Sequence, residues 1–79
     1  MTFEYDKEVD AGYIRLRKGV RVARTERLDD SRLIDYDDAG DPIGIELLNV
    51  TARGVDTRDL PNRAAIERLL TRRKVKLFA

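Results

Sequence analysis

The most chemically suggestive part of the chain is an acidic segment, residues 35–46, whose oxygen-bearing side chains recur at the spacing of a calcium-binding loop. Calcium prefers oxygen ligands, and a glycine at the sixth position lets such a loop turn sharply around the ion. Position 5 is Ala39, however, and the flanking residues have strand-like rather than helical patterns. A hairpin with solvated aspartates fits the segment better, so we expect no bound metal and no cofactor. The residues at positions 1, 3, 6, 7 and 12 are Asp35, Asp37, Gly40, Asp41 and Glu46.

The residue types that catalysis most often needs are missing, because the 79-residue chain contains no histidine and no cysteine. Their absence removes most zinc sites and every serine or cysteine mechanism that needs imidazole. Carboxylates such as Glu4, Glu26 and Asp29 are abundant, but nothing in the sequence isolates two of them in a pocket for acid–base work. We therefore expect no enzyme activity and no catalytic residue.

Charge is divided unevenly along the chain. Residues 1–50 carry eight basic and twelve acidic side chains, a net −4, whereas residues 51–79 carry eight basic and three acidic ones, a net +5. The basic end could contact nucleic acid or an acidic protein, and the simpler interpretation is a solvated face near the acidic body. The residues expected to form a partner surface are Arg68, Arg72 and Arg73 and, as second choice, Tyr13 and Arg15 on the sheet.

Alternation of apolar and polar residues predicts five strands in the first fifty residues. A turn at Lys18-Gly19 suggests a hairpin between the second and third strands. In the third strand the apolar face is interrupted by Arg24 and Glu26, so this strand either bulges or runs past the edge of the core. The predicted strands are residues 2–5, 12–17, 20–28, 33–36 and 43–48.

The chain has one amphipathic helix pattern, since Ile66, Leu69 and Leu70 fall at i, i+3 and i+4. Pro61 suits a first helical turn, and Asp59 is a plausible N-cap. A helix covering one face of an antiparallel sheet predicts an α+β fold in a single domain, residues 1–79. The expected order is a β-meander over 2–50, a connection over 51–59, the helix over 61–72 and a short edge strand over 75–78.

A domain of this size has a small core, which makes association plausible. Edge strands are templates for pairing with another chain, so we expect a homodimer through residues 75–78. The chain lacks an apolar run of roughly 20 residues and begins without a basic-then-apolar leader, so we expect a cytoplasmic protein with no membrane contact.

Two blocks of the sequence, Tyr5 to Leu16 and residues 34–49, resemble the signatures of a family of short prokaryotic proteins named domain of unknown function 2283 (DUF2283). The first runs from Tyr5 to Leu16 and combines Tyr-Asp, an acidic pair, alanine and Tyr-Ile. The second comprises residues 34–40 and 43–49, so the resemblance spans about residues 3–50. Gly12 stands where the family usually shows a larger apolar residue.

The resemblance implies a fold and no catalytic residues. Some members of the family are encoded beside small toxin-like proteins, which implies an antitoxin-like or partner-binding role. We therefore expect a non-catalytic protein-interaction module, and the alternative is a nucleic-acid-binding accessory protein that uses the basic helix.

Overall fold

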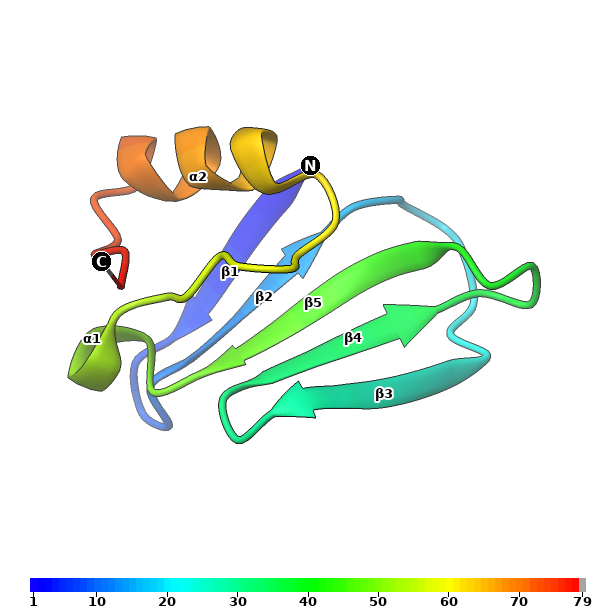
Figure 1. The fold of residues 1–79 in the computed structure, drawn as a ribbon, viewed down its shortest axis with the longest axis horizontal. Helices are drawn as coiled ribbons and strands as arrows, with labels where there is room; N and C mark the ends of the chain where they lie inside the picture. The colour runs from blue at the N-terminus through cyan, green and yellow to red at the C-terminus, as the bar shows by residue number, and fades with distance from the viewer. Residues whose placement is uncertain (79) are drawn as a thin grey trace.

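The computed structural model describes residues 1–78, which form an antiparallel sheet of five strands with helices on one side of it (Figure 1). The predicted α+β class, with a five-stranded antiparallel sheet and a C-terminal helix, is confirmed. The elements are β1 (Thr2–Asp6), β2 (Ala11–Arg15), β3 (Arg24–Asp29), β4 (Arg32–Tyr36), β5 (Pro42–Leu48), α1 (Val50–Arg53) and α2 (Arg63–Arg72).

The strands lie in the order β1-β2-β5-β4-β3. The hairpin predicted at Lys18-Gly19 is therefore wrong, because β2 pairs with β5 and β3 lies at the far edge. The reason is burial: β2 buries Gly12 and Ile14 and β5 buries four of its residues, Ile43, Gly44, Ile45 and Leu47, whereas all six residues of β3 are exposed. Strands that can bury an apolar face take the centre of the sheet, and the hydrophilic strand takes the edge.

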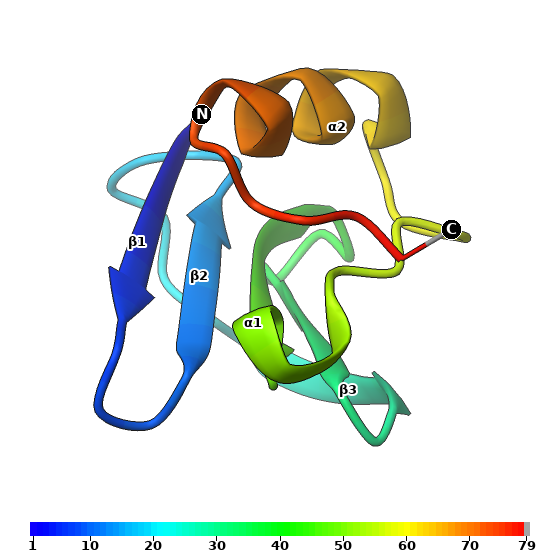
Figure 2. The same ribbon diagram turned by 90° about the vertical axis from the view of Figure 1, so that its left-hand side faces the viewer.

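The core lies between the sheet and α2, as the spacing of the helix's apolar residues predicts. Ile66, Leu69 and Leu70 are buried against sheet residues that include Ile14 and Ile45. Figure 2 shows α2 lying across the β1–β2 end of the sheet. The remaining members of this cluster are Phe3, Ile34, Leu47, Val50, Val55 and Leu60.

The start of α2 differs from the prediction. The helix begins at Arg63 rather than at Pro61, and its N-cap residue is Asn62, which makes no side-chain capping bond. Asp59 and Asn62 both adopt left-handed backbone conformations, with φ of 64° and 55°. These two turns bring Leu60 into the core, so Asp59 is used to bend the connection rather than to cap the helix.

The C-terminal segment is not the edge strand that the sequence predicts. Lys74 adopts a φ of 60°, which ends α2 and turns the chain back toward the centre of the molecule. Leu77 then forms an isolated parallel bridge with Val55. The Val55 N–H donates to the Lys76 carbonyl over 2.9 Å, and the Phe78 N–H donates to the Val55 carbonyl over 2.8 Å. Residues 75–78 thus pair with the connection through a single bridge and form no regular strand.

Within the connection predicted for residues 51–59, the structure has a short helix, α1, whose N-terminus is held by a distant residue. The Asp10 carboxylate, in the β1–β2 turn, accepts the N–H groups of Thr51 over 2.9 Å and of Ala52 over 3.1 Å. It also accepts the Tyr5 hydroxyl over 2.7 Å, while the Asp10 carbonyl accepts the Val50 N–H. A carboxylate on exposed N–H groups at a helix start satisfies donors that lack an intrahelical partner.

This capping predicts acid sensitivity. Hydrogen bonds from Thr51 and then Tyr5 lower the pKa of Asp10 from 3.8 to about 2. Because the folded-state pKa lies below the unfolded one, the stabilisation is present above about pH 4 and is lost as pH falls toward 2. We expect the melting temperature of the wild type to fall over this interval, and Asp10→Asn to reduce that fall while lowering the melting temperature at neutral pH.

The control is Asp38→Asn, at an exposed carboxylate that accepts no hydrogen bond from the described residues. Thermal melts followed by circular dichroism at successive pH values measure the effect. Equal pH dependence in wild type and Asp10→Asn would contradict the capping role.

Candidate functional site

The acidic segment at residues 35–46 forms the β4–β5 hairpin. The Asp37 carboxylate accepts the N–H groups of Ala39 over 3.0 Å and of Asp41 over 2.9 Å, and Gly40 takes the left-handed conformation with a φ of 85°. Asp35 and Glu46, the outer members of the calcium template, belong to the strands themselves. Across residues 1–78 no cluster of three acidic, histidine or cysteine side chains is placed to hold a metal ion. The predicted pairing of the two strands across this turn is confirmed.

Tyr13, a predicted partner residue, belongs to a hydrogen-bonded group on the sheet face opposite α2. Its hydroxyl donates to Asp35 over 2.8 Å, and the same carboxylate accepts the Thr25 hydroxyl over 2.6 Å. The ring lies over Gly44, where a Cβ atom would come within 1.7 Å of the tyrosine oxygen. Burial, followed by the bond to Asp35, raises the pKa of Tyr13 to about 12. Tyr13 is therefore a fixed hydrogen-bond donor and not a base.

Arg15, the second sheet residue expected to bind a partner, lies beside Tyr13. Its guanidinium carbon is 5.5 Å from the centre of the Tyr13 ring, and one nitrogen is 3.8 Å from the Glu4 carboxylate. An ion pair of this length at a half-exposed position contributes little, so the guanidinium is free to exchange partners. The structure thus brings Tyr13 and Arg15 together, with the tyrosine locked and the arginine accessible.

Arg73, the third arginine expected in the helix surface, fastens the end of α2 to β1. Its Nη1 donates to the Phe3 carbonyl over 3.0 Å, and its guanidinium lies 5.6 Å from the centre of the Phe3 ring. That ring in turn covers Gly12, where an added Cβ would come within 2.5 Å of a ring carbon. The aromatic ring therefore occupies the space that a larger residue at position 12 would need.

Arg68 and Arg72 are exposed i, i+4 neighbours on α2. Within residues 1–78 neither lies within 4.0 Å of a carboxylate, whereas Arg63 on the same helix pairs with Glu67 over 3.2 Å. Lys74 and Lys76, which follow the helix, are likewise exposed and unpaired in the described part of the chain. We call these four cations, Arg68, Arg72, Lys74 and Lys76, the basic surface.

A cavity of about 330 Å³ adjoins the basic surface. Its apolar lining comes from Phe3, Val50 and Val75, and Lys74 and Lys76 contribute positive charge. This volume is at the small end of the range for ligand sites, enough for one side chain of a partner. The sequence pattern did not reveal this cavity, because it forms only where β1, the unpredicted helix α1 and the C-terminal segment meet. The other lining residues are Tyr5, Thr51 and Arg73.

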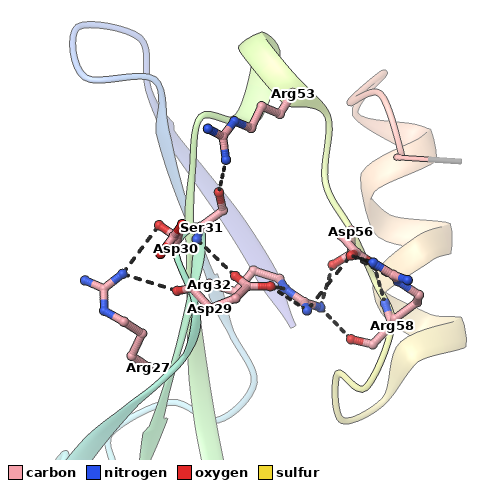
Figure 3. Close-up of polar contacts among 8 residues, drawn as sticks. All are labelled: Arg27, Asp29, Asp30, Ser31, Arg32, Arg53, Asp56 and Arg58. Carbon is pink, nitrogen blue, oxygen red and sulfur yellow. Dashed lines mark hydrogen bonds and ion pairs between the residues drawn. The ribbon is translucent and has the colours of Figure 1, made fainter.

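A larger cavity of about 570 Å³ lies near the β3–β4 turn, beside the buried residue Arg32. Figure 3 shows the polar contacts of Arg32. The Arg32 Nε and Nη2 atoms donate to one Asp29 oxygen over 3.0 and 2.8 Å. Its Nη1 donates to the carbonyls of Asp56, over 2.9 Å, and Arg58. A single guanidinium therefore clamps the connection between α1 and α2 to the sheet.

The charged residues that line this cavity are equal in number, three arginines (Arg32, Arg53 and Arg58) and three aspartates (Asp29, Asp30 and Asp56). The Arg58 Nε and Nη2 atoms both donate to the Asp56 carboxylate, the latter over 2.6 Å. These hydrogen bonds hold the pKa of Asp56 well below its usual range. Arg53 donates to the Ser31 hydroxyl over 3.4 Å. Because the lining carries as many arginines as aspartates, the cavity has little net charge with which to select an ion.

The comparison with known families covers the strands of the sheet and does not extend to the basic surface. The model of DUF2283, a protein family of unknown function, matches residues 2–50. The chain belongs to that family. No curated protein matches the chain, and no solved structure does. The DUF2283 match contains all five strands and ends at the first residue of α1, so α2 and the basic surface lie outside it.

No helix within residues 1–78 is long and apolar enough to cross a bilayer.

Proposed function

We propose that this DUF2283 protein is a non-catalytic interaction module that binds an acidic protein partner through the basic surface. The observation that carries the proposal is the position of that surface. Its exposed cations have no carboxylate partner among residues 1–78, and two of them line a cavity with apolar walls. A partner that places an apolar side chain in this cavity and carboxylates around it matches both features.

The form of this proposal that follows from the family resemblance is an antitoxin-like role, with a small toxin-like protein as the acidic partner. Two features of the chain support a binding role in the cytoplasm. It lacks histidine and cysteine, which removes the commonest catalytic groups, and a cysteine-free chain suits a reducing compartment.

The alternative is nucleic-acid binding by the same cations. The i, i+4 arrangement of Arg68 and Arg72 favours this alternative, since it could contact successive phosphates. The apolar lining of the adjoining cavity favours a protein, because phosphates need cations but no apolar anchor. Nucleic-acid binding would weaken steeply and linearly with the logarithm of salt concentration.

The test compares two charge reversals of equal size in the tagged protein purified from its own host. Arg68→Glu with Arg72→Glu removes half of the basic surface, whereas Lys7→Glu with Lys18→Glu changes two exposed lysines in turns. We expect a small acidic protein to co-purify stoichiometrically with wild type and the lysine variant, and to bind the arginine variant roughly tenfold or more weakly.

Each result has a distinct meaning. If the arginine variant retained the same protein, the binding site would not lie on α2. Salt-dependent binding of labelled DNA or RNA to the purified chain, lost in the arginine variant, would replace the proposal by the nucleic-acid alternative. A chain that binds neither class of molecule contradicts both.

A further inference from the structure

The edge strand β3 differs from every other strand of the sheet because all six of its residues are exposed. It pairs only with β4, at the margin of the sheet away from α2 (Figures 1 and 2). An edge strand presents unpaired backbone N–H and C=O groups that another strand can use. The opposite edge, β1, differs because Arg73 is bound to its Phe3 carbonyl and ring.

The side chains of β3 are complementary to those of a second copy in one register. Two antiparallel β3 strands related by a two-fold axis must place some residue opposite its own copy, because the axis passes through the centre of a residue pair. With Thr25 at that centre, Arg24 lies opposite Glu26 of the second copy, and Glu26 lies opposite its Arg24. Opposite charges directly across an antiparallel pair are stabilising.

Other registers are less favourable. An axis through Arg24, Glu26 or Arg27 would place two like charges opposite one another at the centre. An axis through Leu28 would fall on the β-bulge between Arg27 and Asp29, where the ladder is already irregular. Like charges directly opposite are destabilising, and bulges interrupt pairing, so the charge pattern selects the register centred on Thr25.

One further observation agrees with this register. The charged groups are held in position beforehand, since the Arg24 Nε lies 2.9 Å from the Glu26 carboxylate and its guanidinium 4.3 Å from the centre of the Tyr36 ring. Groups already ordered in the free chain lose less entropy on association.

We propose that β3 pairs antiparallel with β3 of a second copy of this chain around a two-fold axis at Thr25. The two sheets then form one continuous sheet of ten strands. This association lies beyond the proposed function, because it uses the edge of the sheet far from α2 and leaves the basic surface open in both copies. It also replaces residues 75–78 as the expected dimer edge.

A single introduced thiol tests the register, since the chain has no cysteine of its own. Residues directly opposite in an antiparallel pair have Cβ atoms about 4.5–5.5 Å apart, close enough for a disulfide to form with a small shift of the strands. We expect Thr25→Cys to give a covalent dimer under mild oxidation, and Thr71→Cys, at an exposed threonine of α2, to stay a monomer on a denaturing gel.

A charge swap tests the same register without touching Thr25. We expect sedimentation equilibrium of the wild type to show a concentration-dependent dimer. Arg24→Glu alone and Glu26→Arg alone should each abolish it by opposing like charges, and the double swap should restore it. Circular dichroism checks that each variant is folded.

The proposal is overturned by a wild type that is monomeric up to millimolar concentration, or by a dimer that survives both single substitutions. A double swap that fails to restore the dimer also overturns the register. Because Arg68 and Arg72 are unchanged throughout, partner binding by these variants reports separately on the proposed function.

Discussion

Leu70→Ala is expected to lower the free energy of unfolding by about 3 kcal/mol, within the range of roughly 2–5 kcal/mol seen when buried leucines are truncated. Leu70 is completely buried in the core cluster that joins α2 to the sheet. The loss combines the transfer energy of the missing methyl and methylene groups with the cavity left behind. For a chain of this length the total stability is about 4–12 kcal/mol, so this single change removes a large part of it.

Urea unfolding followed by circular dichroism measures this effect, with Val9→Ala as the control. Val9 is 67% exposed in the turn after β1, so its truncation is expected to change stability by about 0.5 kcal/mol or less. If Leu70→Ala were as mild as Val9→Ala, α2 could not be the element that closes the core. If Leu70→Ala is unfolded without urea, the smaller truncation Ile66→Val at another fully buried position supplies the comparison.

The sequence predicts this core because the buried residues of each element recur with the period of that element. The i, i+3, i+4 spacing of Ile66, Leu69 and Leu70 identifies the buried stripe of α2, and alternation over 43–48 identifies the inner face of β5. The hairpin at Gly40 follows equally from local turn chemistry. In these segments each residue's neighbours in the chain already determine which side of it is buried.

The order of the strands depends on long-range pairing and could not be predicted in the same way. Lys18-Gly19 has the composition of a hairpin turn, and Gly19 does adopt a positive φ, but within a longer connection. A usable signal was present nonetheless. Leu28 is the only apolar residue in β3, and a strand that cannot bury either face belongs at an edge.

Contacts across the chain explain the other differences. The four-residue helix α1 is too short to show periodicity, and its capping residue, Asp10, is more than forty positions away. In the candidate site, too, the local pattern predicts some features, and contacts between distant parts of the chain determine others. The exposure of Arg68 and Arg72 follows from the helical stripe, whereas the attachment of Arg73 to Phe3 requires α2 to be docked on β1.

The role of Arg32 could not be predicted from the sequence, because a charged side chain in an alternating strand suggests a solvated position. In the structure its side chain is only 7% exposed and donates to Asp29 and to the carbonyls of Asp56 and Arg58. These are the contacts that hold the 54–60 connection on the sheet (Figure 3). Removing the guanidinium leaves partly buried acceptors without a donor, which costs more than the loss of a hydrogen bond between exposed groups.

Arg32→Met, which keeps the length of the side chain, is therefore expected to lower the free energy of unfolding by about 3 kcal/mol, at the low end for a broken buried pair because Asp29 remains partly solvated. Arg32→Lys should recover only part of the loss, since one ammonium cannot reach acceptors on both sides of the clamp. Urea unfolding gives the energies, with Arg21→Met at an exposed position as the control.

Amide hydrogen exchange locates the part of the structure that Arg32→Met destabilises. The Val55 and Phe78 amides, which join the connection to the C-terminal segment, should exchange faster in Arg32→Met, even under conditions where the amides of β2 and β5 are still protected. Unchanged protection at Val55 would mean that the core contacts of Val55 and Leu60 hold the connection by themselves. Faster exchange confined to the Val55 and Phe78 amides would show that the buried Arg32 guanidinium couples the sheet to the C-terminal part of the chain, which carries the basic surface.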